Sequence, residues 1–275
     1  MDRLGAIWVN GKPIRSVSAV NRGLEFGDGI FETIRYHRGK LISLECHLNR
    51  LSAGLEKLFF PSCLLRVRSD LNTVLDCLRL TEDEDVIIRV TVTRGEGQRG
   101  YTPESSSFPT VIVRASVSYQ NPRLQADPMK VELSDLKLGI QPSLAGIKHI
   151  NRLEQVLASI EKRERSVDEL LMISLEGLPV SFITGNLFIR EGASLHTPII
   201  KSCGIEGTRR SLILSTLAPM AKYTAFESLL TLKRILSADE LIFCNTVTGI
   251  RSIRTLGPKD WSDHSASTAL HKAYV

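Results

Sequence analysis

This chain of 275 residues lacks the patterns that mark several protein classes. Aromatic residues make up only 6% of it, and its five cysteines are widely spaced, with no Cys-x-x-Cys pair. An odd number of scattered cysteines disfavours a disulfide framework or a zinc site and favours reduced thiols in the cytoplasm. No apolar run is long enough to span a membrane, and the N-terminus has no apolar core of signal-peptide length. We therefore expect a cytoplasmic protein with no metal site and no membrane association.

The chain also lacks a strong excess of one charge sign, since its formal net charge is only +5. Basic and acidic residues alternate, as in Glu161-Lys-Arg-Glu-Arg165, a pattern typical of a solvated helix face. No basic stripe carries interleaved aromatics, so nucleic acid is not an expected partner. A modest positive excess suits an anionic small substrate and a phosphate-bearing cofactor.

The first part of the chain predicts short strands and two helices. Asn10-Gly11 indicates a hairpin between 7–9 and Ile14, and Arg38-Gly39-Lys40 indicates another between 31–36 and 41–43. Apolar periodicity predicts the remaining elements, which are helices 45–58 and 64–80 and strands 86–93 and 110–117.

The second part begins after the stretch 119–123, which lacks apolar periodicity and contains a proline. The expected elements are strand 129–133, helix 151–164, strands near 170–174, 178–183 and 187–190, helices beginning near Thr208 and Phe226, and strand 240–244. The tail after Pro258 is polar and weakly patterned. The prediction is therefore an α+β protein with domains 1–118 and 124–275 joined by linker 119–123, and a ligand in a cleft between the domains.

Lys148 lies in the run Gly146-Ile-Lys-His-Ile-Asn-Arg-Leu-Glu-Gln-Val-Leu157. Most lysines are surface charges, but Gly146 gives the backbone freedom just before this one. The residues Leu153, Val156, Leu157 and Ile160 then mark one apolar helix face. A lysine at such a strand-to-helix junction can point into a cleft, where desolvation lowers its pKa and allows a Schiff base with a carbonyl cofactor.

Two glycine-rich segments are candidates for binding. Gly95–Gly100 matches G-x-G-x-x-G, but the residues after it cannot open the helix that a dinucleotide site needs, so a mobile loop with Arg94, Arg99 and Tyr101 is the better interpretation. Gly204–Arg210 opens a helix at Thr208, where free N–H groups can bind phosphate. An ordinary loop with a glycine turn fits this second segment equally well.

Read together, these motifs resemble the fold-type-IV pyridoxal-phosphate enzymes, the class IV aminotransferases. The resemblance spans nearly the whole chain, and its most specific parts are Phe26-Gly-Asp-Gly29 and Lys148-His-Ile-Asn-Arg-Leu-Glu-Gln-Val-Leu157. It implies a two-domain fold like that of D-amino acid aminotransferase, with pyridoxal 5′-phosphate (PLP) in the interdomain cleft. It also implies a homodimer with shared active sites, in which the loop at 94–101 reaches the partner's substrate.

The resemblance gives each candidate residue a role. Lys148 would carry the cofactor, Thr33 would line the substrate side, and Arg99 and Tyr101 would hold a substrate carboxylate. The implied phosphate contacts are Arg50, Gly207, Thr208, Arg209 and Thr246. One position departs from the family pattern, because Ser181 stands where relatives place a glutamate opposite the pyridine nitrogen.

Three functions follow from this pattern. The leading one is a lyase that converts 4-amino-4-deoxychorismate to 4-aminobenzoate and pyruvate, in folate biosynthesis, because aromatisation can compensate for the weak electron sink beside Ser181. A class IV aminotransferase for D- or branched-chain amino acids is the alternative within the fold. A non-catalytic relative is the third, and retention of Lys148, Arg50 and the phosphate loop argues against it.

Overall fold

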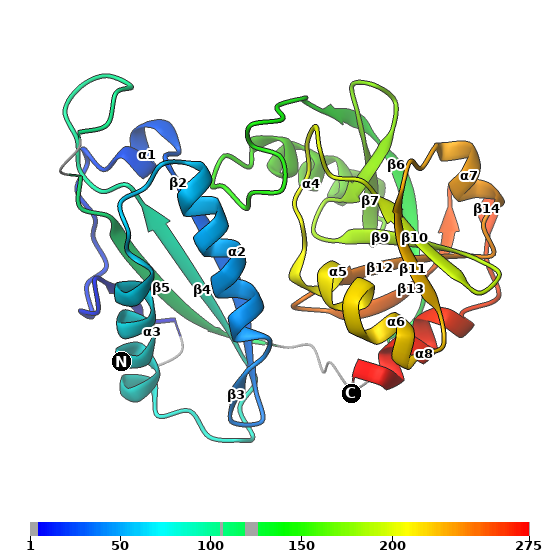
Figure 1. Ribbon diagram of the computed structural model, residues 1–275, viewed down its shortest axis with the longest axis horizontal. Coiled ribbons are helices and arrows are strands. Elements are labelled where there is room, and N and C mark those ends of the chain that lie inside the picture. The colour runs from blue at the N-terminus through cyan, green and yellow to red at the C-terminus, as the bar shows by residue number, and fades with distance from the viewer. Residues whose placement is uncertain (1–4, 105–106, 119–125, 275) are drawn as a thin grey trace. The chain divides into compact units, whose positions relative to one another are not determined.

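The computed structural model describes residues 5–104, 107–118 and 126–274, and the expected linker 119–123 lies outside them. The chain divides into two compact units (Figure 1). The first unit comprises residues 1–120 and 147–151, and the second comprises residues 121–146 and 152–275. The segment 147–151, which includes Lys148, thus belongs with the first unit although the residues on either side of it belong to the second.

An antiparallel sheet of five strands forms the first unit, in the order β1-β5-β4-β2-β3. The helices α2 and α3 pack on one face of this sheet (Figure 1). The elements of the unit are β1 (Ile7–Val9), α1 (Arg22–Phe26), β2 (Gly29–His37), β3 (Lys40–Leu41), α2 (Leu44–Lys57), α3 (Leu64–Leu78), β4 (Val86–Thr93) and β5 (Thr110–Val117).

Alternating side chains build the core of this unit. In β4, Val86, Ile88, Val90 and Val92 are each at most 1% exposed and point toward the helices, while Arg89 between them is exposed. The helices bring their leucine and valine stripes to the same core. A strand with this period-2 pattern has one dry face and one face free for polar residues, so the sheet face opposite α2 and α3 can carry a site.

The second unit contains a larger mixed sheet, in the order β11-β10-β9-β12-β13-β6-β7-β8, with β14 paired to β13. The strands are β6 (Met129–Leu138), β7 (Glu169–Ser174), β8 (Pro179–Phe182), β9 (Asn186–Glu191), β10 (Ser194–Pro198), β11 (Thr224–Ser228), β12 (Glu240–Asn245), β13 (Gly249–Leu256) and β14 (Lys259–Asp260). The helices are α4 (Leu153–Arg165), α5 (Thr208–Leu212), a π-helical turn η1 (Ile213–Leu217), α6 (Ala218–Met220), α7 (Leu232–Ser237) and α8 (Ser265–Tyr274).

Two connections shape this sheet. The chain leaves β6, passes through α4 and returns as β7 parallel to β6, because parallel neighbours need a crossover of this kind. The continuous helical stretch from α5 to α6 packs with α8 against β9, β12 and β13. The phosphate loop predicted at 204–207 therefore leads directly into a helical stretch that is fixed against the sheet.

Most of the predicted elements are confirmed within a few residues, and two differ. The hairpin expected to reach Ile14 is a turn with a single bridge between Val9 and Lys12. The helix expected near Phe226 is wrong, since that residue lies in edge strand β11 and the helix α7 starts at Leu232. Pairing with β10 decides the conformation there, and a local pattern does not show such pairing.

The polar tail after Pro258 contains helix α8, which the sequence did not predict. Its first turn is stabilised by the buried Glu240, whose carboxylate accepts hydrogen bonds of 2.9 Å from the backbone N–H groups of Ala266 and Ser267. A carboxylate at a helix N-terminus satisfies free N–H groups and complements the helix dipole.

The helix predicted at α4 forms, but its apolar face is exposed. Leu153, Val156, Leu157 and Ile160 are 77%, 51%, 55% and 42% exposed, while Ala158 on the other side of the helix is buried. The pattern predicts the helix correctly, but this face does not pack into the core of its own unit.

Candidate functional site

Lys148 lies beside the start of β2, in a short extended segment rather than at the mouth of a helix. The carbonyl of Lys148 accepts a hydrogen bond of 2.9 Å from the Phe31 N–H, and Ile150 N–H donates to the Gly29 carbonyl at 3.0 Å. The Lys148 ammonium lies 4.3 Å from the centre of the Phe31 ring. Gly146 has φ of +83°, so the freedom expected of this glycine is used.

Phe31 and Thr33 lie on the sheet face opposite α2 and α3, since alternate residues of a strand share a face. Thr33 pairs with Arg89 of β4, which in turn pairs with Arg114 of β5. The Arg89 guanidinium lies 3.7 Å from the Phe31 ring centre, and partial desolvation there, with the nearby charge of Arg114, lowers the pKa of this otherwise exposed residue. Lys148 and two arginines thus give this face a positive potential, which suits an anionic substrate.

On the other face of β2, Glu32 interrupts the apolar alternation and binds two side chains of α2. Its carboxylate lies 2.6 Å from His47 Nδ1 and accepts a hydrogen bond of 2.7 Å from Arg50 Nε. Glu32 is 1% exposed and His47 is fully buried. We refer to Glu32, His47 and Arg50 as the Glu32 cluster.

The pKa values within the Glu32 cluster follow from these contacts. Burial alone would raise the pKa of Glu32, but the hydrogen bonds from His47 and Arg50 outweigh it and hold this pKa below its usual value. Burial lowers the pKa of His47 despite Glu32, and the charges of Arg50 and Lys148 lower it further. At neutral pH the cluster therefore contains an ionised Glu32 and a neutral His47.

Arg50 was predicted to contact a phosphate, and the structure shows that it is also held by Glu32. Glu32 and His47 themselves were missed from the sequence. The sequence does contain a sign that Glu32 is buried. It alternates along the strand with Ile30 and Ile34, so its side chain points to the same face as theirs, which forms the core. A buried carboxylate on that face needs a cationic or donor partner from the helix above it.

The loop at 94–101, which the sequence predicts to be mobile, is hydrogen-bonded to α1 in the structure. Arg94 is 6% exposed and donates to the Phe59 and Leu58 carbonyls at 3.0 and 2.7 Å, so its role is structural. Arg99 and Tyr101 are exposed, with Tyr101 at 85%. Both are therefore accessible on the surface of their unit.

In the second unit, the structure brings three of the predicted phosphate contacts together. The hydroxyls of Thr208 and Thr246 are 2.9 Å apart. Gly207 precedes α5, and a Cβ at this position would lie 2.0 Å from Asn186 Oδ1, so only glycine fits. Asn186 Nδ2 donates to the Ile205 carbonyl at 2.9 Å and holds the loop in place. Paired hydroxyls at a helix start suit a phosphate group.

Arg209 and Ser181 have other surroundings. The Arg209 guanidinium is stacked 3.5 Å from the centre of the Tyr274 ring on α8, and the residue is 3% exposed. Ser181 lies in β8 opposite Met172 and is partly exposed. A buried carboxylate in β7, Glu169, is bound to the Thr184 hydroxyl at 2.6 Å, and burial raises its pKa. The Glu169 carboxylate is thus already bound to a hydroxyl in the turn that follows β8.

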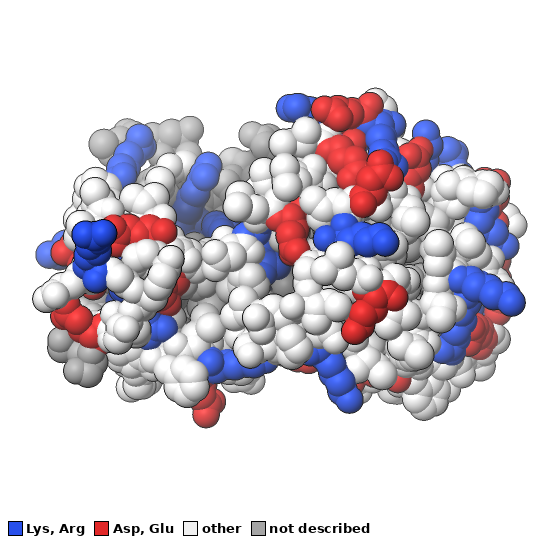
Figure 2. All heavy atoms as spheres, turned by 90° about the horizontal axis from the view of Figure 1, so that it is seen from above, with Lys and Arg blue, Asp and Glu red and all other residues white. Residues whose placement is uncertain are grey.

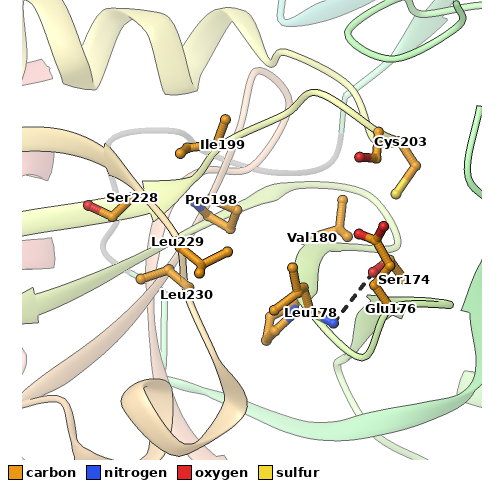
Figure 3. A pocket seen from close by; sticks show the side chains of 12 residues that line it. Ser174, Glu176, Leu178, Val180, Pro198, Ile199, Cys203, Ser228, Leu229 and Leu230 are labelled. Atoms are coloured by element: carbon orange, nitrogen blue, oxygen red, sulfur yellow. Dashed lines mark hydrogen bonds between the residues drawn. The ribbon is translucent and has the colours of Figure 1, made fainter. Parts of the chain in front are cut away.

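A hollow of about 60 Å³ in the second unit contains none of the predicted residues (Figure 3). It lies between the turn from β7 to β8, the stretch 198–203 and residues 228–230. Burial, together with Glu154 and Glu176, raises the pKa of the Cys203 thiol here to about 11. A protonated thiol is a poor nucleophile, so this hollow does not provide a second reactive centre.

Two further findings concern the surface and the fold as a whole. Basic and acidic side chains are interspersed on the face shown in Figure 2. Among residues 5–104, 107–118 and 126–274, no helix has the length and apolar composition needed to cross a membrane. Within the same described ranges, no three His, Cys, Asp or Glu side chains gather as a metal site would require.

The family profile of Amino-transferase class IV matches residues 29–256, so the chain belongs to this family of PLP-dependent enzymes. Its fold is that of the fold-type-IV enzymes. The chain is 32% identical to the aminodeoxychorismate lyase of Vibrio harveyi over 250 residues, which cover 90% of this chain and 89% of that one.

Two other proteins are similar to this chain, one in structure and one in sequence. The crystal structure of 4-amino-4-deoxychorismate lyase from Pseudomonas aeruginosa has a TM-score of 0.89 and 31% identity, with 97% of each chain covered. A putative branched-chain-amino-acid aminotransferase of Methanocaldococcus jannaschii is 30% identical over 249 residues, covering 89% of this chain and 85% of the relative. Lyases and aminotransferases are thus both similar to this chain.

Proposed function

We propose that this chain is a PLP-dependent lyase that converts 4-amino-4-deoxychorismate to 4-aminobenzoate and pyruvate. The observation that carries this is the placement of Lys148, whose ammonium lies over Phe31 on the sheet face that also presents Thr33, Arg89 and Arg114. An amine for covalent binding and proton transfer then stands beside cations that attract a substrate with carboxylates.

The second unit fits the phosphate of this cofactor. Thr208, Thr246 and the backbone around Gly207 offer hydroxyl and N–H donors, and the glycine allows close approach. Arg50 supplies a guanidinium that Glu32 already orients. Arg209 stays assigned to the same group as a prediction from the resemblance, acting through its backbone since its side chain is stacked on Tyr274.

When bound, PLP supplies an electron sink for bond cleavage at the substrate. Lys148 would hold the cofactor, and its amine would remove the proton from ring carbon C4 of the substrate. Thr33 lines the substrate side, and Arg99 and Tyr101 bind a carboxylate. Loss of the C4 proton and of the pyruvate unit makes the ring aromatic, so the reaction tolerates Ser181 in place of a carboxylate at the pyridine nitrogen.

The test is a spectrum and an assay on the purified protein. We expect a visible absorption band that borohydride removes, and pyruvate release from 4-amino-4-deoxychorismate. The similarity to aminotransferases supports a second candidate, transamination of D- or branched-chain amino acids. If amino acids are transaminated faster than pyruvate is released, that second function replaces the first.

We further propose a homodimer with shared active sites, in the cytoplasm. The four exposed apolar side chains of α4 form the kind of patch that marks an interaction surface. Arg99 and Tyr101 would serve the partner's site, as their exposure permits. Mixing Arg99→Ala with Lys148→Ala should restore activity through hybrid dimers, and Leu157→Glu should produce monomers in sedimentation. A monomeric wild type without complementation would exclude this arrangement.

A further inference from the structure

One buried arginine, Arg22 of α1, joins the loop at 94–101 to the Phe-Gly-Asp-Gly segment. Arg22 is 3% exposed. Its guanidinium donates from Nη1 to the Gly100 carbonyl at 2.9 Å and from Nη2 to the Tyr101 carbonyl at 2.6 Å. A guanidinium offers a rigid fork of donors, so binding two consecutive carbonyls fixes both the place and the orientation of that peptide.

The third nitrogen of the Arg22 guanidinium, Nε, donates a hydrogen bond to Asp28. The same carboxylate oxygen, Oδ2, accepts from Arg22 Nε at 3.0 Å and from Arg94 Nε at 2.7 Å. Arg94 is in turn bound to the carbonyls at the end of α2. One carboxylate therefore holds both ends of the loop, and the charge-assisted bonds are shielded from water by burial.

Backbone contacts keep the loop close to α1 along its length. Arg22 N–H donates to the Gly95 carbonyl at 2.8 Å, and Gly97 N–H donates to the Val20 carbonyl at 3.3 Å. A Cβ at Gly97 would lie 2.8 Å from Arg22 Cδ, so this glycine allows the loop to lie on the arginine stem. The Phe26 ring, 5.4 Å from that of Tyr101, completes the contact.

We propose that Arg22 is a positioning residue for substrate binding, which sets the place of Arg99 and Tyr101 through the backbone of Gly100 and Tyr101. This rests on the proposed function, in which those two side chains bind a substrate carboxylate. Both side chains are exposed, and beside the ring contact of Tyr101 with Phe26 it is the backbone of Gly100 and Tyr101 that Arg22 holds. The backbone clamp then determines the geometry in which they meet the carboxylate, and it acts on substrate binding rather than on proton transfer at Lys148.

The test compares Arg22→Lys with wild type as holoenzyme. A lysine keeps the charge but has all its donors on one nitrogen, so it cannot span the three separate acceptors that Nε, Nη1 and Nη2 of Arg22 reach. We expect KM for 4-amino-4-deoxychorismate to rise about tenfold while kcat stays within about twofold, since the lost contacts act on binding. Amide hydrogen exchange over residues 97–101 should become faster, and the visible absorption band should not change.

Arg190→Lys is the matched control. Arg190 is also buried, and its guanidinium likewise combines ion pairs, to Asp239 and Asp263, with a backbone carbonyl, that of Gly192. It belongs to the second unit and should affect neither KM nor exchange at 97–101. If Arg22→Lys raises KM no more than this control does, or leaves the exchange unchanged, the clamp has no positioning role.

A second variant disturbs the clamp from the loop side. Gly97→Ala forces the loop and the Arg22 stem apart and should raise KM and the exchange rate in the same direction, so the proposal is tested even if Arg22→Lys does not fold. A wild type with no visible band or pyruvate release would overturn the proposed function instead. The exchange measurement still decides on the clamp in that case, because it needs no turnover.

Discussion

The candidate residues of the two units are held by different kinds of interaction. In the first unit, buried ionic groups hold one another in place, as in the Glu32 cluster and the pair of arginines on Asp28. In the second unit, the proposed phosphate contacts are Gly207, two threonine hydroxyls and the backbone of Arg209, and Ser181 stands where the resemblance predicts a carboxylate. Charged groups thus orient the candidate side chains of the first unit, whereas hydroxyl and backbone dipoles are the proposed donors in the second. We therefore expect substitutions in the first unit to have larger effects on activity and on the free energy of unfolding than substitutions in the second.

The largest effect is expected from Lys148→Ala. This variant removes the amine that binds the cofactor and exchanges the proton, so both pyruvate release and the visible absorption band should be lost. Lys57→Ala, at the C-terminal end of α2, is a control that should keep both. Substantial pyruvate release by Lys148→Ala would show that another group performs the chemistry.

Glu32→Gln should have the next largest effect, on stability as well as on activity. Removing the charge takes the carboxylate of the buried Glu32 away from the partly buried Arg50, and such a loss costs about 3 kcal/mol in the free energy of unfolding. Urea denaturation measures it. Glu45→Gln, on the helix that carries Arg50, is the matched control, because the ion pair of Glu45 with Arg68 is exposed and should contribute little. Equal effects of the two variants would show that the Glu32 cluster is not a stabilising unit.

The pH dependence of stability tests the state of His47. Its pKa is lowered from 6.5 in the folded protein, so the unfolded chain takes up a proton first as the pH falls below 6.5. The stability from a neutral His47 is therefore present above 6.5 and declines below it, by at most about 1.4 kcal/mol per pH unit. His47→Gln should flatten this slope in urea denaturation between the two pKa values. An unchanged slope would mean that His47 is charged in the folded state.

The smallest effect is expected at Ser181, in the unit with the weaker dipoles. Ser181→Glu should raise transamination of amino acids more than pyruvate release, because a carboxylate that pairs with the ring nitrogen strengthens the electron sink. Both activities are measured side by side in wild type and variant, with Ser181→Ala as the control without a charge. A larger gain in pyruvate release would contradict the view that aromatisation already compensates for the weak sink.

The sequence predicts most of the fold because its periodic patterns are strong. The strands 86–93 and 110–117 agree with the structure to the residue, since Val, Ile and Thr alternate there between a core and an open face. Helix α8 was missed because its start depends on Glu240, which is far away in the chain. Edge strand β11 was missed for a similar reason, as it depends on pairing with β10.

For the site, the sequence identifies residues but not the contacts that orient them. Lys148 and Arg50 follow from motifs, while Glu32 and His47 do not, because their importance comes from distances of less than 3 Å between two elements. The loop at 94–101 shows the same limit. Its glycines and polar residues suggest mobility, and the clamp by Arg22 depends on a residue 78 to 79 positions earlier in the chain. Contacts across such separations leave no local pattern.

The segment 147–151 has a consequence for how this protein can be taken apart. Because these residues belong to the first unit and both flanks belong to the second, no single cut yields the two units as separate polypeptides. A fragment ending at residue 118 would lose the segment that bonds to Gly29 and Phe31, and with it Lys148. A chimera that joins residues 1–120 of this protein to the remaining part of a relative would pair this sheet with a foreign segment 147–151, and so with a foreign lysine. The two parts of the chain are therefore expected to be inherited together.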